Sequence, residues 1–218
     1  MKYYPVFLDI SDKPCAVVGG GEVACRKVQR LLQCGARVTV IADALMPELE
    51  ALKARGEIAH INDQYAAQHI ASAFIAIGAT DNRHVNEQIF RDARARHILV
   101  NIVDEPERCD FILPSIVERG DLAVAISTGG KSPALAKHLR RELEATFGKE
   151  YETYLDIMGQ IREVVLAKDR SSVENKKIFE SLVQSDLLHF IRKNDWNAVR
   201  HLIREILQEP IEVCLPNG

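Results

Sequence analysis

The sequence predicts an α/β fold in which a parallel sheet with helices on both faces is followed by a central segment and a small C-terminal helical domain. Three observations support this prediction. β-Branched runs alternate with helical patterns up to residue 103, a glycine turn joins the first run to the first helix, and helical periodicity dominates after residue 148. The 218 residues are 47% hydrophobic and 27% charged, which is enough for one large domain and a smaller partner.

The first two strands and the helix between them are predicted as a βαβ unit. Residues 15–18 indicate a short buried strand, the glycines at 19–21 follow it, and a helical pattern then continues to Cys34. The run RVTVIA at 37–42 is rich in β-branched residues and predicts the second strand. Further strands are expected at 57–61, 73–79 and 98–103, with helices at 47–55 and 82–96. This alternation predicts a parallel sheet that is covered on both faces.

The pattern changes after Pro114. Residues 121–127 predict one more strand, and the loop TGGKSP then leads into a helix from Ser132 to Phe147. Later helices are expected at 151–168, 173–184 and 196–208, and a last strand at 211–214. We therefore expect three parts, at 1–113, 114–148 and 149–218.

The overall composition excludes several classes of protein. A net charge of −3 gives no strong electrostatic footprint for nucleic acid or an anionic membrane at the level of the whole chain, which leaves a local basic surface as the alternative. The five cysteines are odd in number and contain no C-x-x-C pair, which favours a reduced, cytoplasmic setting. Charged residues at 9, 12 and 13 interrupt any N-terminal signal peptide, and no run reaches the ~18 apolar residues of a membrane span.

Sequence motifs for metals and hydrolysis are absent as well. The seven histidines show no H-x-x-x-H or H-E-x-x-H spacing, and the cysteines complete no cluster, so we expect no metal site. Without a G-x-S-x-G elbow or a Walker A sequence, hydrolase and nucleotide-triphosphatase functions lack support.

The run GGGEVA at 19–24 satisfies G-x-G-x-x-A, a variant of the dinucleotide-binding motif of Rossmann-type sheets. Gly19 permits a tight turn beside Gly20, Gly21 lets the backbone approach a pyrophosphate, and Ala24 lets the helix lie close to the strand. A glycine-rich turn without a ligand is the alternative. Because the motif lies between a strand and a helix, a dinucleotide is the favoured ligand.

An acidic residue about 20 positions after this motif usually binds the adenosine ribose. Asp43 is the candidate, although a helix N-cap or turn residue explains it equally well, since it stands just beyond the strand. No lysine or arginine occurs between Thr39 and Leu52 to accept a 2′-phosphate, which favours NAD over NADP.

Polar segments follow three of the predicted strands, where ligands of open parallel sheets bind. They are GATD at 78–81, NIVD at 101–104 and STGGKSP at 127–133, and Thr80 and Asn101 are candidate cofactor contacts. Asp104 could accept a proton while hydride leaves the same substrate. The alternative is a solvated turn aspartate ahead of Glu105 and Pro106.

The third segment could bind an anionic substrate through Ser127, Thr128 and Lys131, which precede a helix N-terminus. The helix that follows carries four basic residues, Lys137, His138, Arg140 and Arg141. These could hold a polycarboxylate, or they could form only a solvated face.

Two stretches resemble the dehydrogenase/ferrochelatase modules of siroheme synthases, with a resemblance that covers residues 3–145. They are PVFLDISDKPCAVVGGGEVACRKVQRLLQCGARVTVIA and NIVDEPERCDFILPSIVERGDLAVAISTGGKSPALAKHLRREL. The resemblance implies oxidation of precorrin-2 to sirohydrochlorin with NAD, and some relatives also insert ferrous iron to give siroheme.

The resemblance also implies roles for single residues. Asp104 corresponds to the essential aspartate of the family, and Thr128 to a serine that is phosphorylated in some members. The NAD contacts of the family fall on Glu22, Val23, Asp43 and Ala44. A homodimer is implied, in which residues 114–148 cross between subunits, and Lys131, Lys137 and Arg141 become candidate partners of the substrate carboxylates.

A protein that senses NAD(H) without turnover is a further alternative, because a Rossmann-type fold does not by itself imply catalysis. Such a protein needs an output element, and the sequence contains no basic recognition helix or membrane span. It would also leave NIVD and STGGKSP unexplained. An enzyme is therefore the favoured interpretation.

Overall fold

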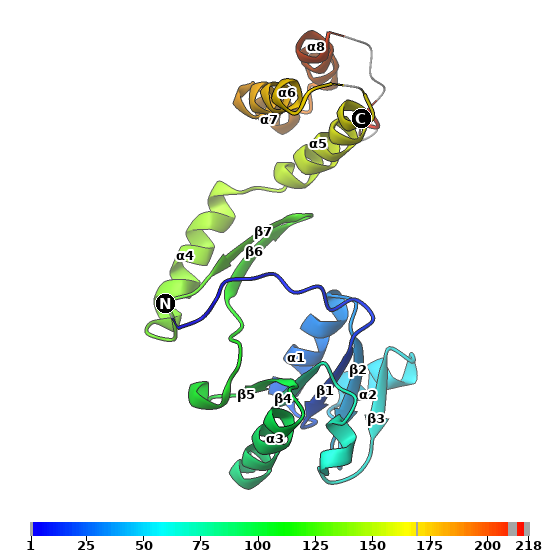
Figure 1. Ribbon diagram of the computed structural model, residues 1–218, viewed down its shortest axis with the longest axis vertical. Coiled ribbons are helices and arrows are strands. Elements are labelled where there is room, and N and C mark those ends of the chain that lie inside the picture. The colour runs from blue at the N-terminus through cyan, green and yellow to red at the C-terminus, as the bar shows by residue number, and fades with distance from the viewer. Residues whose placement is uncertain (1, 169, 209–212, 216–218) are drawn as a thin grey trace. The chain divides into compact units, whose positions relative to one another are not determined.

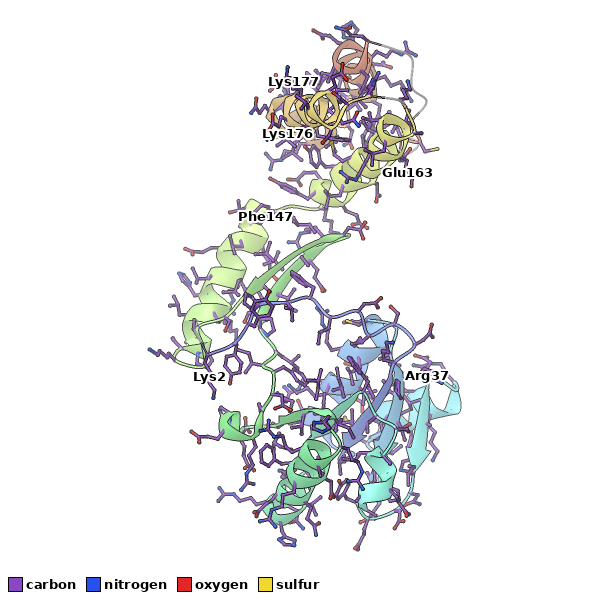
Figure 2. All side chains as sticks on the ribbon, in the orientation of Figure 1. Lys2, Arg37, Phe147, Glu163, Lys176 and Lys177 are labelled. Atoms are coloured by element: carbon purple, nitrogen blue, oxygen red, sulfur yellow. The ribbon has the colours of Figure 1, made fainter. Side chains whose placement is uncertain are left out.

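The computed structural model describes residues 2–168, 170–208 and 213–215. The chain divides into two compact units, Met1–Leu113 and Pro114–Gly218, of which the second holds both the predicted central segment and the predicted helical domain. Figure 1 shows the elements of each unit, and Figure 2 adds their side chains.

The first unit is built on a five-stranded parallel sheet with the strand order β3-β2-β1-β4-β5. The strands are β1 (Pro14–Val18), β2 (Arg37–Ile41), β3 (Ile58–Ile61), β4 (Ile75–Gly78) and β5 (Leu99–Ile102). The helices are α1 (Glu22–Gln33), α2 (Pro47–Ala54) and α3 (Arg83–Ala95), with short 3₁₀ helices η1 (Ala67–Ile70) and η2 (Pro106–Arg108). The predicted parallel α/β sheet is confirmed.

Alternate residues of β1 face opposite sides of this sheet, as the two-residue period of a strand requires. Cys15 and Val17 pack with the apolar faces of α1 and α2 in one buried cluster, whereas Ala16 and Val18 pack with α3 and η1 in another. Helices therefore cover both faces. The central strands are apolar on both sides for this reason.

The second unit begins with an antiparallel hairpin, β6 (Ser115–Arg119) and β7 (Leu122–Ile126), against which helix α4 (Pro133–Thr146) packs. The guanidinium of Arg119 donates hydrogen bonds to the carbonyls of Glu144 (3.1 Å) and Phe147 (2.8 Å) and so ties the hairpin to the end of α4. The expectation that the strand at 121–127 ends at the edge of the parallel sheet is wrong. The preceding strand β6 is a complete antiparallel partner, and among the described strands β7 pairs with β6 alone.

Four helices complete the second unit: α5 (Glu150–Leu166), α6 (Ser172–Gln184), α7 (Leu187–Arg192) and α8 (Trp196–Leu207). They enclose a core of aliphatic side chains that includes Ile157, Ile161, Leu182 and Val199. Part of the strand expected at 211–214 lies outside the described residues, and Val213 to Leu215 have no regular secondary structure. Among the helices described, none is long and apolar enough to cross a membrane.

Candidate functional site

The glycine turn between β1 and α1 is shaped by close backbone packing. Gly19 has φ +125°, and a Cβ atom on it would lie 2.3 Å from the carbonyl oxygen of Ala79 after β4. A Cβ atom on Gly20 would lie 1.9 Å from the carbonyl oxygen of Ala44 after β2. Neither position can hold a side chain, because backbone atoms occupy the space. The loops after β1, β2 and β4 therefore meet at one point.

Gly21 differs from its two neighbours. Its φ and ψ of −91° and −170° are extended, and no heavy atom lies within 4 Å of the position of a Cβ atom. Gly21 is the N-cap of α1 and supplies no side-chain hydrogen bond to the first turn, so the N–H groups there have no side-chain cap. Open space before uncapped amides fits a pyrophosphate, which the positive end of the helix dipole attracts. Glu22 and Val23 open this helix and lie directly beside that space.

The loop after β2 carries Asp43 and Ala44, which are both exposed. The amide of Met46 donates to the carbonyl of Gly20 (2.9 Å), so this loop is attached to the glycine turn. Because Met46 is the N-cap of α2, the interpretation of Asp43 as an N-cap is wrong. Asp43 lies in a bend, and its carboxylate forms no ion pair with any described residue.

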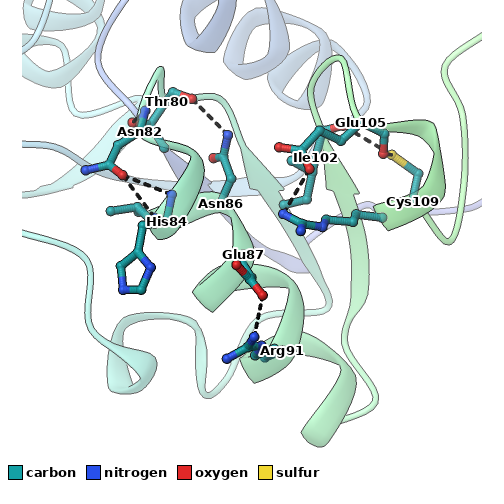
Figure 3. Close-up of polar contacts among 11 residues, drawn as sticks. Thr80, Asn82, His84, Asn86, Glu87, Arg91, Ile102, Glu105 and Cys109 are labelled. Carbon is teal, nitrogen blue, oxygen red and sulfur yellow. Dashed lines mark hydrogen bonds and ion pairs between the residues drawn. The ribbon is translucent and has the colours of Figure 1, made fainter.

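Hydrogen bonds fix the loop that contains Thr80, between β4 and α3 (Figure 3). The Asn86 side chain donates to the Thr80 carbonyl (2.9 Å), while the Thr80 hydroxyl accepts from the Asn82 amide (3.1 Å). Asn82 Oδ1 in turn accepts from the amides of His84 (3.0 Å) and Val85 (3.3 Å), which caps α3. Asn86 was not predicted from the sequence, although an asparagine on the apolar face of a helix signals a specific partner.

Asp104 lies just beyond β5, next to the strand that precedes Thr80. The register pairs Val18 with Gly78 and Gly78 with Ile102, so β1, β4 and β5 end side by side. Asp104 is exposed, has φ +61°, and makes no ion pair with a described residue. A carboxylate in a left-handed turn at the ligand-binding edge of a parallel sheet is available to a substrate.

Asn101 is 7% exposed and directs its amide into the protein. Its Nδ2 atom donates to the carbonyl of Phe111 (2.9 Å) and contacts the sulfur of Cys109 (3.5 Å). Through these contacts Asn101 supports the backbone next to the turn that contains Asp104. Its role as a cofactor contact stays a prediction.

Lys27 on α1 also belongs to this region, although its part in the site was not predicted from the sequence. Burial lowers the pKa of Lys27, and the charge of Arg26 lowers it further, whereas Asp104 and Cys109 act in the opposite direction. The ammonium group of Lys27 is thus within electrostatic range of the Asp104 carboxylate. The sequence feature that could have indicated Lys27 is its position one residue before the buried Val28, on the side of α1 that faces the sheet.

The loop after β7 forms a compact turn within the second unit. The hydroxyl of Ser127 accepts from the amide of Gly129 (3.1 Å), and that of Thr128 accepts from the amide of Ser132 (3.2 Å). Lys131 is exposed, and Ser132 caps α4 by accepting from the amide of Leu135 (3.2 Å). The two hydroxyls can still donate their protons, which leaves them able to bind an anion.

The basic face of α4 is partly neutralised by its own carboxylates. His138 lies 3.4 Å from Glu142, and Arg140 pairs with Glu144. Lys137 and Arg141 are exposed, and neither has an ion-pair partner among the residues that the structure describes.

A cavity of about 440 Å³ lies beside the Asp104 turn in the first unit, at the N-terminus of α3. It is lined by Arg83, His84, Glu87, Glu105 and Arg108. Glu105 pairs with Arg108 (2.9 Å), and Glu87 pairs with Arg91, so Arg83 and His84 are the basic groups left to meet a ligand. The described residues contain no group of three or more histidine, cysteine, aspartate or glutamate side chains that could hold a metal ion.

The chain is similar to known proteins over most of its length. The family described as "Putative NAD(P)-binding" matches residues 6–115, and the family described as "Sirohaem biosynthesis protein central" matches residues 119–146. The siroheme synthase of Actinobacillus succinogenes is 39% identical over 200 residues, which are 92% of this chain and 42% of that protein. "Siroheme synthase 3" of Aeromonas hydrophila subsp. hydrophila is 42% identical over 188 residues, or 86% of this chain and 40% of that protein.

The chain thus spans well under half the length of these two relatives. The solved structure of "SirC, precorrin-2 dehydrogenase" has the same fold, with a TM-score of 0.79, 24% identity, and coverage of 95% of this chain and 100% of that one. The model of the "Putative NAD(P)-binding" family matches half of the sequence, and the sirohaem central segment follows it in order, so the chain belongs to this NAD(P)-binding family.

Proposed function

We propose that the chain is an NAD-dependent dehydrogenase that oxidises precorrin-2 to sirohydrochlorin in siroheme biosynthesis. The observation that carries the proposal is the exposed Asp104 carboxylate at the edge of the sheet where the uncapped α1 helix also begins. The names of the relatives indicate a tetrapyrrole substrate, and the site has a carboxylate and an uncapped helix N-terminus that suit its oxidation with a dinucleotide. The proposed reaction removes a hydride and a proton from the substrate.

The residues proposed to hold the cofactor surround the glycine turn. The N–H groups of Glu22 and Val23 would bind the pyrophosphate, Gly21 would leave room for it, and Asp43 would accept hydrogen bonds from the adenosine ribose. Ala44, Thr80 and Asn101 are proposed as further contacts along the same edge. A bound NAD would supply the hydride acceptor for the oxidation. We favour NAD over NADP because the loop after β2 contains no basic residue.

Asp104 is proposed to accept the proton that leaves the substrate as the C–H bond breaks. A carboxylate serves this role when it reaches the reacting carbon and is ionised. Its exposure and lack of an ion-pair partner among described residues leave both oxygens free to accept. The ammonium group of Lys27 lies within electrostatic range of this carboxylate.

The substrate is proposed to be held by groups that suit its many carboxylates. Arg83 and His84 line the cavity beside the Asp104 turn. Ser127, Thr128, Lys131, Lys137 and Arg141 in the second unit are the other candidates. A homodimer formed through residues 114–148 is also proposed, because the described β6–β7 sheet has two strands and leaves one backbone edge of each open to a second chain.

The test is anaerobic incubation of the protein with precorrin-2 and NAD while NADH and sirohydrochlorin are measured. We expect the two products to form in equal amounts. Absence of both products with a folded protein that binds NAD would refute the dehydrogenase and favour an NAD(H)-sensing module. NADP in place of NAD is the matched control and should react more slowly.

A second activity, insertion of ferrous iron as a substrate into sirohydrochlorin, is supported by the siroheme synthase relatives. Asp104 would then assist the loss of the pyrrole protons. Adding ferrous iron after the oxidation is complete tests this step separately. Siroheme should appear faster than in the protein-free control, and equal rates would assign only the dehydrogenase to this chain.

A further inference from the structure

The Cys109 thiol lies inside the loop that carries Asp104. Its sulfur is 3.2 Å from the carbonyl oxygen of Ile102 and 3.3 Å from that of Glu105, so the S–H proton can be shared between them. Asn101 Nδ2 contacts the same sulfur from below at 3.5 Å. Figure 3 shows Cys109 beside Ile102 and Glu105. The thiol thus joins the two ends of the turn whose interior contains Asp104.

This turn needs support, because Asp104 adopts φ +61°, a conformation that residues other than glycine rarely occupy. One backbone hydrogen bond closes it, from the Glu105 amide to the Ile102 carbonyl (3.2 Å). A second one, from the Arg108 amide to the Glu105 carbonyl (2.9 Å), continues into η2. The thiol adds contacts to both of those carbonyls.

We propose that Cys109 is a positioning residue for Asp104, whose thiol bridges the Ile102 and Glu105 carbonyls and keeps the carboxylate at the sheet edge. The inference rests on the proposed function of Asp104 as proton acceptor. It differs from that function because Cys109 touches neither substrate nor cofactor and acts only through the backbone.

The chemistry of the thiol suits a bridge rather than a reactive group. Burial raises the pKa of Cys109, and the neighbouring Asp110 raises it further, against the lowering effects of the positive charges of Lys2 and Lys27. The sulfur therefore stays protonated and keeps its donor at physiological pH.

The experiment compares C109A, which removes the donor, with C109S, which keeps a donor at the same position. Exposed Cys34, the C-cap residue of α1, provides the matched control C34A. We expect C109A to lower kcat for precorrin-2 oxidation about ten-fold, because small displacements of a catalytic group are costly, with KM and the Kd for NAD nearly unchanged. C109S should recover most of the loss, and C34A should equal the wild type.

Hydrogen–deuterium exchange at the Glu105 amide separates the positioning effect from the proposed function. An exchange rate that is faster in C109A and returns to the wild-type rate in C109S supports the bridge. This holds even if the wild-type protein does not oxidise precorrin-2, because the absence of turnover refutes only the proposed reaction. Wild-type exchange and wild-type kcat in C109A would overturn the inference. A loss of kcat that is equal in C109A and C109S would also overturn it, since the donor would then be irrelevant.

Discussion

Gly21→Ala is the substitution that best separates a glycine required by a ligand from one required by the fold. The backbone of Gly21 is extended, at φ −91°, and no atom lies within 4 Å of the added methyl group. Alanine should therefore leave the free energy of unfolding unchanged, or raise it by up to about 1 kcal/mol through the less flexible unfolded chain. The methyl group would instead occupy the space proposed for the pyrophosphate.

The expected loss of affinity follows from the hydrogen bonds that the methyl group would displace. A hydrogen bond between a charged group and the backbone contributes about 1.5–3 kcal/mol, so the loss of one raises the Kd for NAD roughly 10- to 100-fold. Isothermal titration calorimetry with NAD and urea unfolding of the apoprotein measure the two effects separately.

Gly20→Ala is the matched control, because its methyl group would lie 1.9 Å from the carbonyl oxygen of Ala44. The backbone has to move, and we expect a loss of about 1–3 kcal/mol in the free energy of unfolding together with weaker NAD binding. If Gly21→Ala binds NAD as tightly as the wild type, the dinucleotide does not use this turn. If Gly21→Ala is as unstable as Gly20→Ala, the open space before α1 is not there.

Three further predictions concern the fold and the substrate. Burial raises the pKa of Cys15 from 9.0 to about 11, so between these pH values the thiol ionises in the unfolded chain before it ionises in the folded protein. The free energy of unfolding should therefore fall by up to about 3 kcal/mol as the pH rises from 9 to 11, and urea unfolding of C15A should show a smaller fall than the wild type. N82A removes the cap of α3 and should lower the free energy of unfolding by about 1 kcal/mol, whereas an unchanged value would show that the cap is dispensable. R83A should raise the KM for precorrin-2 roughly 10- to 100-fold, as expected for one lost charged hydrogen bond, and leave the Kd for NAD unchanged, so a normal KM would exclude Arg83 as a substrate contact.

Sequence periodicity predicted the first unit almost completely, because each of its strands is a short apolar run between punctuating residues. β6 was missed, since only Ile116 and Val117 of its five residues are apolar and its pairing depends on the turn at Gly120. Helix α7 was missed because its six residues are too few for a helical period to stand out. In both cases the tertiary partner, rather than local pattern, stabilises the element.

The candidate site was predictable where a motif or a strand end marks it, as at the glycine turn and Asp104. The roles of Lys27, Asn86 and Cys109 were not predictable, because they depend on loops that meet only in the folded chain. Cys109 illustrates the limit, since it lies seven positions after Ile102 and nothing in the spacing indicates that its sulfur reaches that carbonyl. Residues that position others have no pattern of their own.

The measurement that tests the central claim most directly is NADH formation from precorrin-2 by D104N under anaerobic conditions. Asparagine tolerates the left-handed backbone and keeps the size of the side chain, but it cannot accept the proton. We predict that kcat falls about 10²- to 10⁴-fold while the Kd for NAD stays that of the wild type. A D104N protein that forms NADH at the wild-type rate would contradict the account.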